Sequence, residues 1–377
     1  MFYQDFKLGI LGGGQLGRML IQSCVNFNVT TSVIDPDSQA PCSGFSNEFK
    51  KGSLQDYETV YNFGKSVDLL TIEIENVNVK ALEKLEQEGV KVFPQSNVIK
   101  VIQDKRVQKQ FYLDNNIPTA DFVLIDSKDD IQNHLDFLPA FQKLGTGGYD
   151  GGGVQRLKSS SDLDKAFDAP SLLEKLVDFK KEVAVICARN ADGEISVYPA
   201  VELVFHPEYN LVDYLLAPAR ISPELEKKAQ DIARKTTEAL GIVGILAVEL
   251  FQTQDDEFLV NEVAPRPHNS GHQSINANFT SQYEQHLRAI LNLPLGSTAT
   301  KRPSAMVNLL GEEGYTGAAI YEGLDAILKI EGVSLFLYGK KITKPHRKMG
   351  HITIIDDDVD RLIEKVELVK NTIKVIA

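Results

Sequence analysis

Residues 245–272, ILAVELFQTQDDEFLVNEVAPRPHNSGH, decide the fold of the chain. Two apolar segments within this stretch, residues 245–251 and 258–263, have the composition of β-strands, and the polar residues 254–257 between them are typical of a turn. The pattern predicts a β-hairpin whose strands are largely buried. Each strand nevertheless carries one carboxylate where a core side chain would ordinarily lie.

The two carboxylates belong to Glu249 and Glu262. If the hairpin turns at the midpoint of its polar segment, Glu249 pairs with Glu262 and Phe251 pairs with Val260. Directly paired residues project to the same face of a sheet, so the two negative charges would lie side by side. Such a pair needs a cation, and carboxylate oxygens are ligands that Mg²⁺ prefers, so the sequence predicts a magnesium site. The alternative is an exposed hairpin with two solvated glutamates.

A polar segment follows the second strand, in residues 264–272, and it contains Arg266, His268, Asn269 and His272. Its prolines keep the segment out of a helix. A guanidinium together with imidazole and amide groups suits a pocket for a small oxyanion. A zinc site at His268 and His272 would need both rings on one face of a helix, which the prolines and the glycine disfavour.

The N-terminal residues have the pattern of a doubly wound α/β domain. A predicted strand at residues 7–11 leads into GGGQLGRM, residues 12–19, and a second predicted strand at residues 30–34 ends at Asp35. The glycine spacing and the acid match the pattern of dinucleotide-binding domains, which makes an NAD-dependent oxidoreductase an alternative. The same glycines permit a tight turn and close packing of a helix, so the pattern indicates the fold rather than the ligand.

A glycine-dense segment follows a short predicted strand that ends in Lys143. Residues 145–153, GTGGYDGGG, contain too many glycines for a stable helix or strand. Such a segment brings backbone N–H groups close to an anion and can fold over it as a lid. The alternative is a flexible hairpin tip without a ligand, which leaves Lys143 and the neighbouring Tyr149 and Asp150 unexplained.

The composition is that of a soluble enzyme without a nucleic-acid partner. The formal net charge is −12 and the basic residues are scattered rather than striped. Three widely separated cysteines argue against a disulfide framework and favour a reducing compartment. No segment has the length of a membrane span, and the N-terminus lacks a secretory signal. We therefore expect a cytoplasmic protein with no membrane partner.

Five motifs occur in a fixed order along nearly the whole chain, namely GGGQLGRM, EIEN, GGYDG, NEVAPRPHNSGH and RKMGH. Together they resemble the ATP-grasp ligases, and the wording of the last two is similar to the members that carboxylate aminoimidazole ribonucleotide in purine biosynthesis. The resemblance implies an α/β ATP-grasp fold. Its parts would be an N-terminal Rossmann-like, doubly wound domain (residues 1–102), a glycine-rich lid subdomain (103–181), a central domain with the metal site (182–300) and a small β-rich C-terminal subdomain (301–377).

The resemblance implies an ATP-dependent carbon–nitrogen ligase with Mg²⁺ as its metal. ATP and bicarbonate would give carboxyphosphate, which then carboxylates the exocyclic amine of 5-aminoimidazole ribonucleotide. The partners would be these small molecules, and family likeness implies a homodimer. The alternatives are another ATP-grasp ligase such as the formate-dependent purine ligase, a nucleotide sensor without turnover, and the oxidoreductase named above.

The resemblance also assigns roles to individual residues. For ATP they are Lys105, Lys143, Gly148, Tyr149, Asp150, Gly151, Gly152, Gly153, Glu174, Lys175, Leu176, Val177, Glu182, His206, Asn261 and Glu262. For the chemical step they are Arg266, His268, Asn269, Tyr149 and Asp150. For the ribonucleotide they are Gln15, Leu16, Glu73, Lys340, Arg347 and Lys348, of which the last three belong to a basic loop at residues 339–351.

The chain departs from the family pattern in two places. Gly152 and Val154 stand where the lid motif commonly has a basic residue and often a glutamine, which removes a positive charge over the phosphates. One more residue separates Glu202 from His206 than in the Glu-Asn-x-His pattern of the family, which shifts His206 relative to that pattern.

Overall fold

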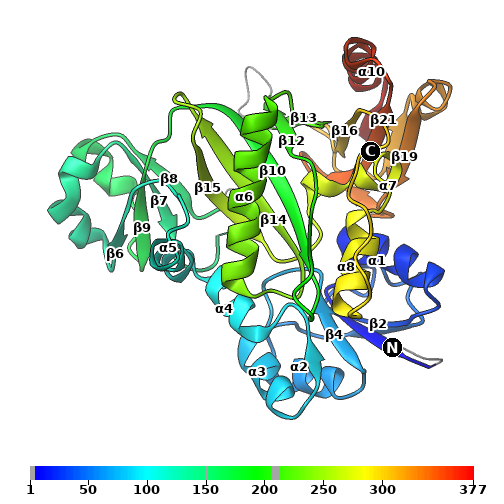
Figure 1. The fold of residues 1–377 in the computed structure, drawn as a ribbon, viewed down its shortest axis with the longest axis horizontal. Helices are drawn as coiled ribbons and strands as arrows, with labels where there is room; N and C mark the ends of the chain where they lie inside the picture. Colours follow the sequence, from blue (N-terminus) through cyan, green and yellow to red (C-terminus); the bar gives the residue numbers. More distant parts are fainter. Residues whose placement is uncertain (1–4, 149–151, 206–211) are drawn as a thin grey trace.

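The structure is a computed structural model that describes residues 5–148, 152–205 and 212–377. Figure 1 shows the N-terminal part at the bottom, a separate small sheet at the left, a large sheet in the centre and the C-terminal part at the upper right. The expected roles of Tyr149, Asp150, Gly151 and His206 lie outside the described residues.

The N-terminal part is a parallel five-stranded sheet with the order β3-β2-β1-β4-β5. Leu8 and Ile10 of the central strand pack against α1 and α8, whereas Leu11 packs on the opposite face, where α2 and α3 lie. Helices on both faces of a parallel sheet confirm the predicted doubly wound domain. The elements are β1 (Lys7–Leu11), α1 (Gln15–Asn26), β2 (Thr30–Asp35), β3 (Glu48–Lys51), α2 (Tyr57–Gly64), β4 (Leu69–Ile72), α3 (Val79–Gln87), β5 (Lys91–Val92), α4 (Ser96–Gln103) and, later in the chain, α8 (Gln282–Ile290).

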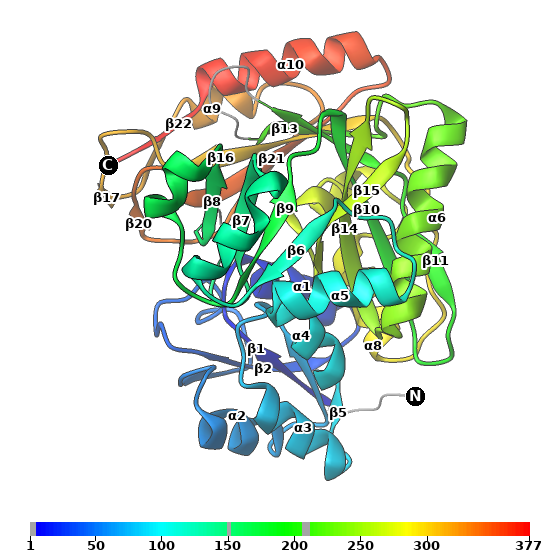
Figure 2. The same cartoon turned by 90° about the vertical axis from the view of Figure 1, so that its left-hand side faces the viewer.

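The small sheet at the left of Figure 1 is antiparallel, with the order β6-β9-β7-β8. The glycine-dense segment joins β7 to β8, and its role as a lid stays a prediction. Figure 2 shows α5 between the strands of this sheet and α4 of the N-terminal part, and α5 contacts both α4 and β9. The elements are α5 (Lys105–Asp114), β6 (Phe122–Ile125), β7 (Ala140–Leu144), β8 (Val154–Leu157), β9 (Ser171–Lys175) and the 3₁₀ helices η1 (Lys128–Phe137) and η2 (Ser160–Lys165).

Among the described residues, the largest sheet has nine strands and runs through both the central and the C-terminal parts of the chain. Its order is β15-β14-β10-β12-β13-β16-β21-β19, with β11 paired to β10. The strands are β10 (Phe179–Arg189), β11 (Ile195–Val197), β12 (Val201–Phe205), β13 (Val212–Ala217), β14 (Gly244–Thr253), β15 (Phe258–Ala264), β16 (Ser304–Leu310), β19 (Val333–Leu337) and β21 (Lys348–Ile355). The pairing of β13 with β16 joins the two parts, and the predicted domain boundaries stay predictions.

Helices cover this sheet at both ends. Ala229 and Ala233 of α6 pack on Val185 and Val248 of the central strands, and Leu362 of α10 packs on the C-terminal strands. Two short strand pairs, β17–β20 and β18–β22, complete the C-terminal part. The remaining elements are α6 (Pro223–Leu240), η3 (Asn269–Gly271), α7 (Ser274–Ala277), β17 (Gly317–Ala318), β18 (Ile320–Glu322), α9 (Leu324–Ile327), β20 (Ile342–Thr343), α10 (Val359–Thr372) and β22 (Lys374–Ile376).

The β14–β15 hairpin confirms the predicted pairing of Glu249 with Glu262. The predicted pairing of Phe251 with Val260 is wrong, because Phe251 pairs with Leu259. The turn is therefore displaced from the midpoint of its polar segment, and the register must change between the turn and the carboxylates.

The change of register occurs at Asn261. Leu250 pairs with Val260 and Glu249 pairs with Glu262, so Asn261 is an extra residue on β15, as in a β-bulge. Because side chains alternate between the faces of a strand, an unbulged strand would have placed Asn261 opposite Glu249 instead. The bulge thus places Glu262 beside Glu249.

The basic loop is shorter than the sequence suggests. The strand expected to follow it begins at Lys348 in β21, so Lys348 and His351 are strand residues rather than loop residues. β22, which pairs with β18, was not expected from the sequence.

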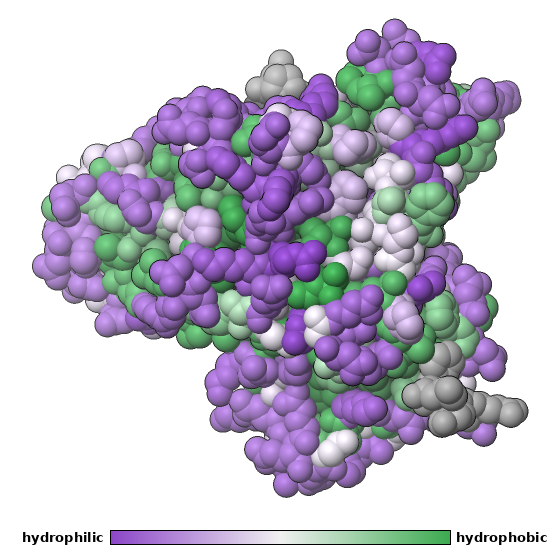
Figure 3. Space-filling view, viewed as in Figure 1, coloured by the Kyte–Doolittle hydropathy of each residue, from purple (hydrophilic) through white to green (hydrophobic). Residues whose placement is uncertain are grey.

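The face of the molecule shown in Figure 3 is mostly hydrophilic, with hydrophobic residues gathered in smaller areas. Among the described residues, no helix combines the length and the apolar character needed to cross a bilayer.

Candidate active site

Three carboxylates share one face of the large sheet. Glu249 lies opposite Glu262, and Glu182 lies two residues from Ala184, which pairs with Glu249 on the other side. Residues two apart on a strand project to the same face, so Glu182 joins the pair. Burial raises the pKa of Glu249 to about 8, and the charges of Glu182 and Glu262 add to this effect. Burial also raises the pKa of Glu182 to about 7. Glu182, Glu249 and Glu262 therefore lack enough nearby positive charge to offset their negative charges.

The Glu249–Glu262 pair suits a hard divalent cation that takes further ligands from elsewhere. Mg²⁺ binds one or two carboxylates and completes its shell with water and phosphate oxygens. In the part of the chain that the structure describes, no group of three or more His, Cys, Asp or Glu side chains is placed to hold a metal ion. The pair thus fits magnesium that arrives with a nucleotide, and the zinc alternative finds no support. His272 instead has its Nδ1 atom 3.0 Å from the hydroxyl of Tyr283.

Two lysines expected at the nucleotide lie beside carboxylates. The Nζ atom of Lys105, at the start of α5, lies 3.4 Å from Oε1 of Glu262. The Nζ atom of Lys143, at the end of β7, lies 2.5 Å from Oε1 of Glu174 on β9. Lys105 therefore lies next to Glu262 of the central sheet, whereas Lys143 pairs with a carboxylate of its own small sheet. This arrangement of opposite charges suits a metal-bound polyphosphate.

The segment after β15 brings Arg266 and His268 to the same site. The Nε atom of Arg266 lies 2.9 Å from Oε1 of Glu75, a buried acid from the N-terminal part. The Nε2 atom of His268 lies 3.7 Å from Oε1 of Glu249. Burial, together with the charges of Arg266 and Lys348, lowers the pKa of His268 to about 3, so its imidazole is neutral near pH 7. Arg266 thus supplies the positive charge here, and His268 supplies a neutral imidazole.

The glycine-rich loop of the N-terminal part is occupied by the protein's own acids. Oδ2 of Asp35 accepts a hydrogen bond from the Gly13 N–H at 2.7 Å, and Oε1 of Glu73 accepts one from the Leu16 N–H at 3.2 Å. A Cβ atom on Gly14 would lie 2.3 Å from Oε1 of Glu73, so only glycine allows this approach. These contacts use N–H groups that a dinucleotide pyrophosphate would need, which disfavours the oxidoreductase alternative. Burial raises the pKa of Glu73 to about 7.

The described glycines of the lid segment pack tightly at its base. The Leu144 N–H donates to the Gly153 carbonyl at 2.9 Å, and a Cβ on Gly148 would lie 2.6 Å from the Gly152 carbonyl oxygen. Gly148, Gly152 and Gly153 thus form the neck of the segment.

The three basic residues expected at the ribonucleotide phosphate do not all point the same way. Lys340 donates to the Lys348 carbonyl at 2.8 Å, and Arg347 donates to the Ile342 carbonyl at 2.6 Å. Lys348 acts electrostatically on Glu249 and His268, so it lies close to the carboxylate cluster. Of the three, Lys348 has the most direct structural connection to the site.

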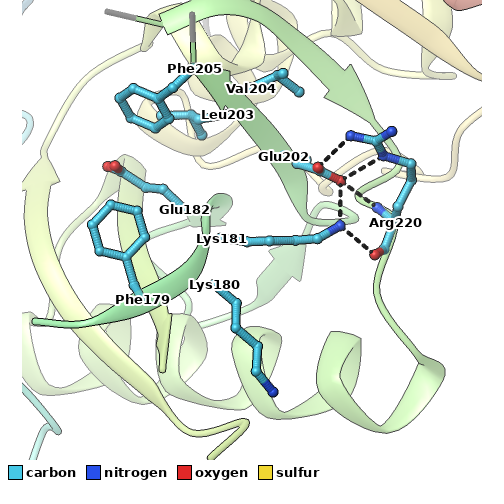
Figure 4. Close-up of a pocket in the computed structure, with 9 residues that line it drawn as sticks. All are labelled: Phe179, Lys180, Lys181, Glu182, Glu202, Leu203, Val204, Phe205 and Arg220. Carbon is cyan, nitrogen blue, oxygen red and sulfur yellow. Dashed lines mark hydrogen bonds and ion pairs between the residues drawn. The ribbon is translucent and has the colours of Figure 1, made fainter. Parts of the chain in front are cut away.

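A pocket of about 610 Å³ opens beside Glu182 (Figure 4). Figure 4 shows the Glu182 carboxylate between the rings of Phe179 and Phe205, while Glu202 pairs with Arg220 and Lys181 away from them. The lining residues are Phe179, Lys180, Lys181, Glu182, Glu202, Leu203, Val204, Phe205 and Arg220. Lys175, Leu176 and Val177, from the expected adenine-binding edge, line a second pocket of about 270 Å³. A pocket in which two phenylalanine rings flank the Glu182 carboxylate suits a nucleoside.

The structure therefore brings together expected residues from seven separate segments: Lys105, Lys143, Glu174, Glu182, Glu249, Asn261, Glu262, Arg266, His268 and Lys348. Gln15 and Leu16 begin α1 beside Glu73, and Asn269 begins η3. Sequence reasoning missed the pairing of Glu75 with Arg266 and the role of Lys109, which contacts Glu174. Lys109 lies four residues after Lys105, so the helical repeat was the signal that both share a face.

Three family models match the chain. A ribonucleotide synthetase preATP-grasp domain matches residues 6–103, an ATP-grasp domain matches residues 110–283, and a phosphoribosylaminoimidazole carboxylase C-terminal domain matches residues 304–365.

Curated relatives and solved structures are similar over nearly the whole chain. The N5-carboxyaminoimidazole ribonucleotide synthase of Bacillus subtilis is 35% identical, over 97% of this chain and 96% of its own. The crystal structure of N5-carboxyaminoimidazole ribonucleotide synthetase from Thermotoga maritima is 44% identical, with a TM-score of 0.91 and 99% of both chains covered. The Aspergillus clavatus N5-carboxyaminoimidazole synthase, crystallised with ADP and 5-aminoimidazole ribonucleotide, is 34% identical, with a TM-score of 0.86 and coverage of 97% of this chain and 100% of that one. Some relatives are longer, and the chain spans 65% of the chloroplastic phosphoribosylaminoimidazole carboxylase of Vigna aconitifolia, at 39% identity over 95% of this chain.

Proposed function

The chain belongs to the N5-carboxyaminoimidazole ribonucleotide synthetases, a family of ATP-grasp ligases, and from this premise we propose how its site performs the family's reaction. The fold is the ATP-grasp fold, and the protein is an ATP-binding carbon–nitrogen ligase. It uses ATP and bicarbonate to carboxylate the exocyclic amine of 5-aminoimidazole ribonucleotide, a step of purine biosynthesis.

One observation carries the mechanism. Glu249 and Glu262 face each other on neighbouring strands, and Lys105 and the Arg266–His268 segment converge on them. Phosphoryl transfer depends mainly on positioning and on neutralising charge, and this arrangement supplies both.

ATP lies between the lid sheet and the large sheet. Its nucleoside occupies the pocket beside Glu182, with the backbone of Glu174, Lys175, Leu176 and Val177 at the adenine edge. Lys105 and Lys143 hold the phosphates. Glu249 and Glu262 would hold Mg²⁺, which would supply positive charge for the phosphate oxygens. Asn261, at the bulge, orients Glu182 through its side-chain amide at 3.5 Å.

Bicarbonate lies near Arg266, His268 and Asn269. The guanidinium of Arg266 binds the anion as a planar fork, and Glu75 holds the guanidinium in place. The neutral imidazole of His268 can hydrogen bond without adding a second positive charge. A bicarbonate oxygen attacks the γ-phosphorus of ATP, ADP leaves, and carboxyphosphate forms.

The ribonucleotide reaches the same site from the N-terminal part. Gln15 and Leu16 border it at the start of α1, and Glu73 accepts hydrogen bonds from the ribose hydroxyls. Lys348, with Lys340 and Arg347, binds the 5′-phosphate. The exocyclic amine then forms a bond to the carboxyl carbon of carboxyphosphate, or of CO₂ released from it, and phosphate leaves.

Gly148 to Gly153 cover the triphosphate, and closure of this lid protects carboxyphosphate from water. Tyr149 and Asp150 help to place the amine, and His206 contacts the nucleotide. These roles follow from family likeness alone, as do a homodimeric assembly and a cytoplasmic location. Light scattering of the purified protein tests the assembly.

The decisive experiment measures ADP release from the full chain with ATP, Mg²⁺, bicarbonate and 5-aminoimidazole ribonucleotide, each omitted in turn. We expect turnover only when the ribonucleotide and bicarbonate are present together, with ribonucleotide consumed in step with ADP released. If the ribonucleotide does not stimulate ADP release, or if formate replaces bicarbonate, the assignment is wrong.

A further inference from the structure

Glu174 is a buried carboxylate shared by two lysines. Its Oε1 atom lies 2.5 Å from Nζ of Lys143, and its Oε2 atom lies 2.5 Å from Nζ of Lys109. The side chains of Glu174 and Lys109 are each 4% exposed, whereas that of Lys143 is 15% exposed. Lys109 is therefore the inner partner of Glu174, and Lys143 is the partner on the solvent side.

The positions of the two lysines in the fold differ in the same way. Lys143 is the last residue but one of β7, close to the glycine-dense segment that would cover the triphosphate. Lys109 lies inside α5, over the ring of Phe122, and its Nζ donates a short hydrogen bond to the hydroxyl of Thr119. Lys109 is thus too enclosed to reach a nucleotide, and nothing in the proposed mechanism uses it.

The charges of Lys109, Lys143 and Glu174 indicate the role of Lys109. With both lysines protonated, the group carries one net positive charge, which belongs to the more exposed Lys143. Without Lys109, Lys143 and Glu174 would form a neutral pair. A phosphate could then bind Lys143 only if Lys143 moved away from Glu174. That movement would leave the buried carboxylate without a cation, which is unfavourable.

Thr119 connects Lys109 to β15, the strand that carries Glu262. The Thr119 hydroxyl donates to the Val260 carbonyl of β15 at 2.8 Å, and Val260 N–H donates to the Pro118 carbonyl at 2.8 Å. Val260 directly precedes the bulge at Asn261. The position of Lys109 is therefore fixed relative to both the lid sheet and the metal carboxylates.

We propose that Lys109 is a positioning residue that keeps Glu174 paired, so that Lys143 is released to the nucleotide phosphates. The proposal rests on the proposed function, because Lys143 must be a phosphate ligand for its release to matter. It assigns to Lys109 an effect on nucleotide binding and none on the ribonucleotide.

The test measures binding of the non-hydrolysable analogue AMP-PNP with Mg²⁺ to the full chain by calorimetry. We expect Lys109→Met to raise the Kd about tenfold or more, the size of effect expected for one charge-assisted hydrogen bond. In turnover assays, the KM for ATP should rise while the KM for the ribonucleotide stays unchanged. Lys165→Met, which removes an exposed lysine of the same lid part, is the matched control and should bind as the wild type does.

A double-mutant cycle with Glu174→Gln separates this role from a merely structural one. In the Glu174→Gln background no carboxylate retains Lys143, so adding Lys109→Met should change the Kd by less than about twofold. The double variant also has no buried unpaired carboxylate, so it can be measured even if Lys109→Met alone does not fold.

Two results would overturn the proposal. One is binding of Lys109→Met within about twofold of the wild type. The other is a Lys109→Met effect that persists undiminished in the Glu174→Gln background. If the wild-type chain itself does not bind AMP-PNP with Mg²⁺, the proposed function fails instead.

Discussion

Glu249 and Glu262 lie directly opposite each other, although the hairpin between them is out of register with that pairing at its tip. The bulge at Asn261 corrects the register one residue before Glu262. The bulge also brings the Asn261 amide within 3.5 Å of Glu182, so one irregularity positions two of the three clustered carboxylates.

Removing one charge of this pair should abolish turnover without unfolding the protein. Glu262→Gln keeps the shape of the side chain, and Glu262 is 57% exposed, so little stability depends on it. We expect a loss of about 100-fold or more in kcat, since a metal ion contributes several kcal/mol to charge stabilisation. Glu257→Gln, an exposed acid of the same hairpin, is the control and should leave kcat unchanged. Turnover of Glu262→Gln at the wild-type rate with Mg²⁺ would contradict the metal role.

The raised pKa of Glu249 predicts that stability falls as pH rises from 7 to 9. The folded state holds a proton up to a pKa of about 8, whereas an unfolded glutamate has already lost it, so the folded state binds more protons in this range. Release of that one proton across the window costs about 1.4 kcal/mol. Chemical denaturation at both pH values measures the change, and Glu249→Gln should reduce it by that amount.

Magnesium nucleotide should weaken the same pH dependence. The metal binds the ionised carboxylates and offsets their repulsion, so with saturating Mg²⁺ and ADP the wild type should retain its stability at pH 9. Calcium-free and magnesium-free buffer with EDTA is the reference state. An equal pH dependence with and without Mg²⁺ and ADP would argue against metal binding at Glu249.

Glu75 should be needed to hold Arg266 for bicarbonate. Glu75→Gln weakens the ion pair whose atoms lie 2.9 Å apart, which frees the guanidinium to move. Misplacement of a positioning group by about 1 Å can cost about 100-fold in rate, so we expect a fall of about 10-fold to 100-fold in kcat/KM for bicarbonate. Binding of ADP should not change. Glu83→Gln, which breaks an exposed ion pair with Lys100 in the same part of the molecule, is the control.

Gly14→Ala should weaken ribonucleotide binding. The new Cβ would lie 2.3 Å from Oε1 of Glu73, so the carboxylate must move from the place where it meets the ribose. We expect the KM for the ribonucleotide to rise about tenfold, the equivalent of one hydrogen bond to a charged group, with the KM for ATP unchanged. Gly44→Ala, with no atom within 4 Å of its new Cβ, should behave as the wild type. Equal KM values for the two variants would show that Glu73 does not bind the ribose.

Much of the site could be predicted from the sequence, because its key contacts are local. The pairing of Glu249 with Glu262 follows from strand alternation within one hairpin. The bulge at Asn261 could not be predicted, because the sequence does not show where a turn of four polar residues is centred. The predicted pairing at Glu249 was correct because the displacement of the turn and the bulge cancel.

Contacts between distant segments were not predictable in this way. The partners Glu75 and Arg266, and likewise Lys109 and Glu174, lie far apart in the sequence, and no local pattern links them. Lys348 was expected in a loop but begins β21, because pairing with β16 extends that strand beyond its most apolar residues. Tertiary pairing decided each of these positions.

The nine-stranded sheet limits how the chain can be recombined with its relatives. β13 and β16 are hydrogen-bonded neighbours, and Lys370 of α10 pairs with Asp213 of β13 at 2.5 Å. A chimera that exchanges everything after residue 300 would therefore combine β13 of one protein with β16 of another, although these strands are hydrogen-bonded neighbours. An exchange that begins before β13 keeps these two strands together but separates β13 from β12, its neighbour on the other side. The strands of this sheet are therefore best exchanged together.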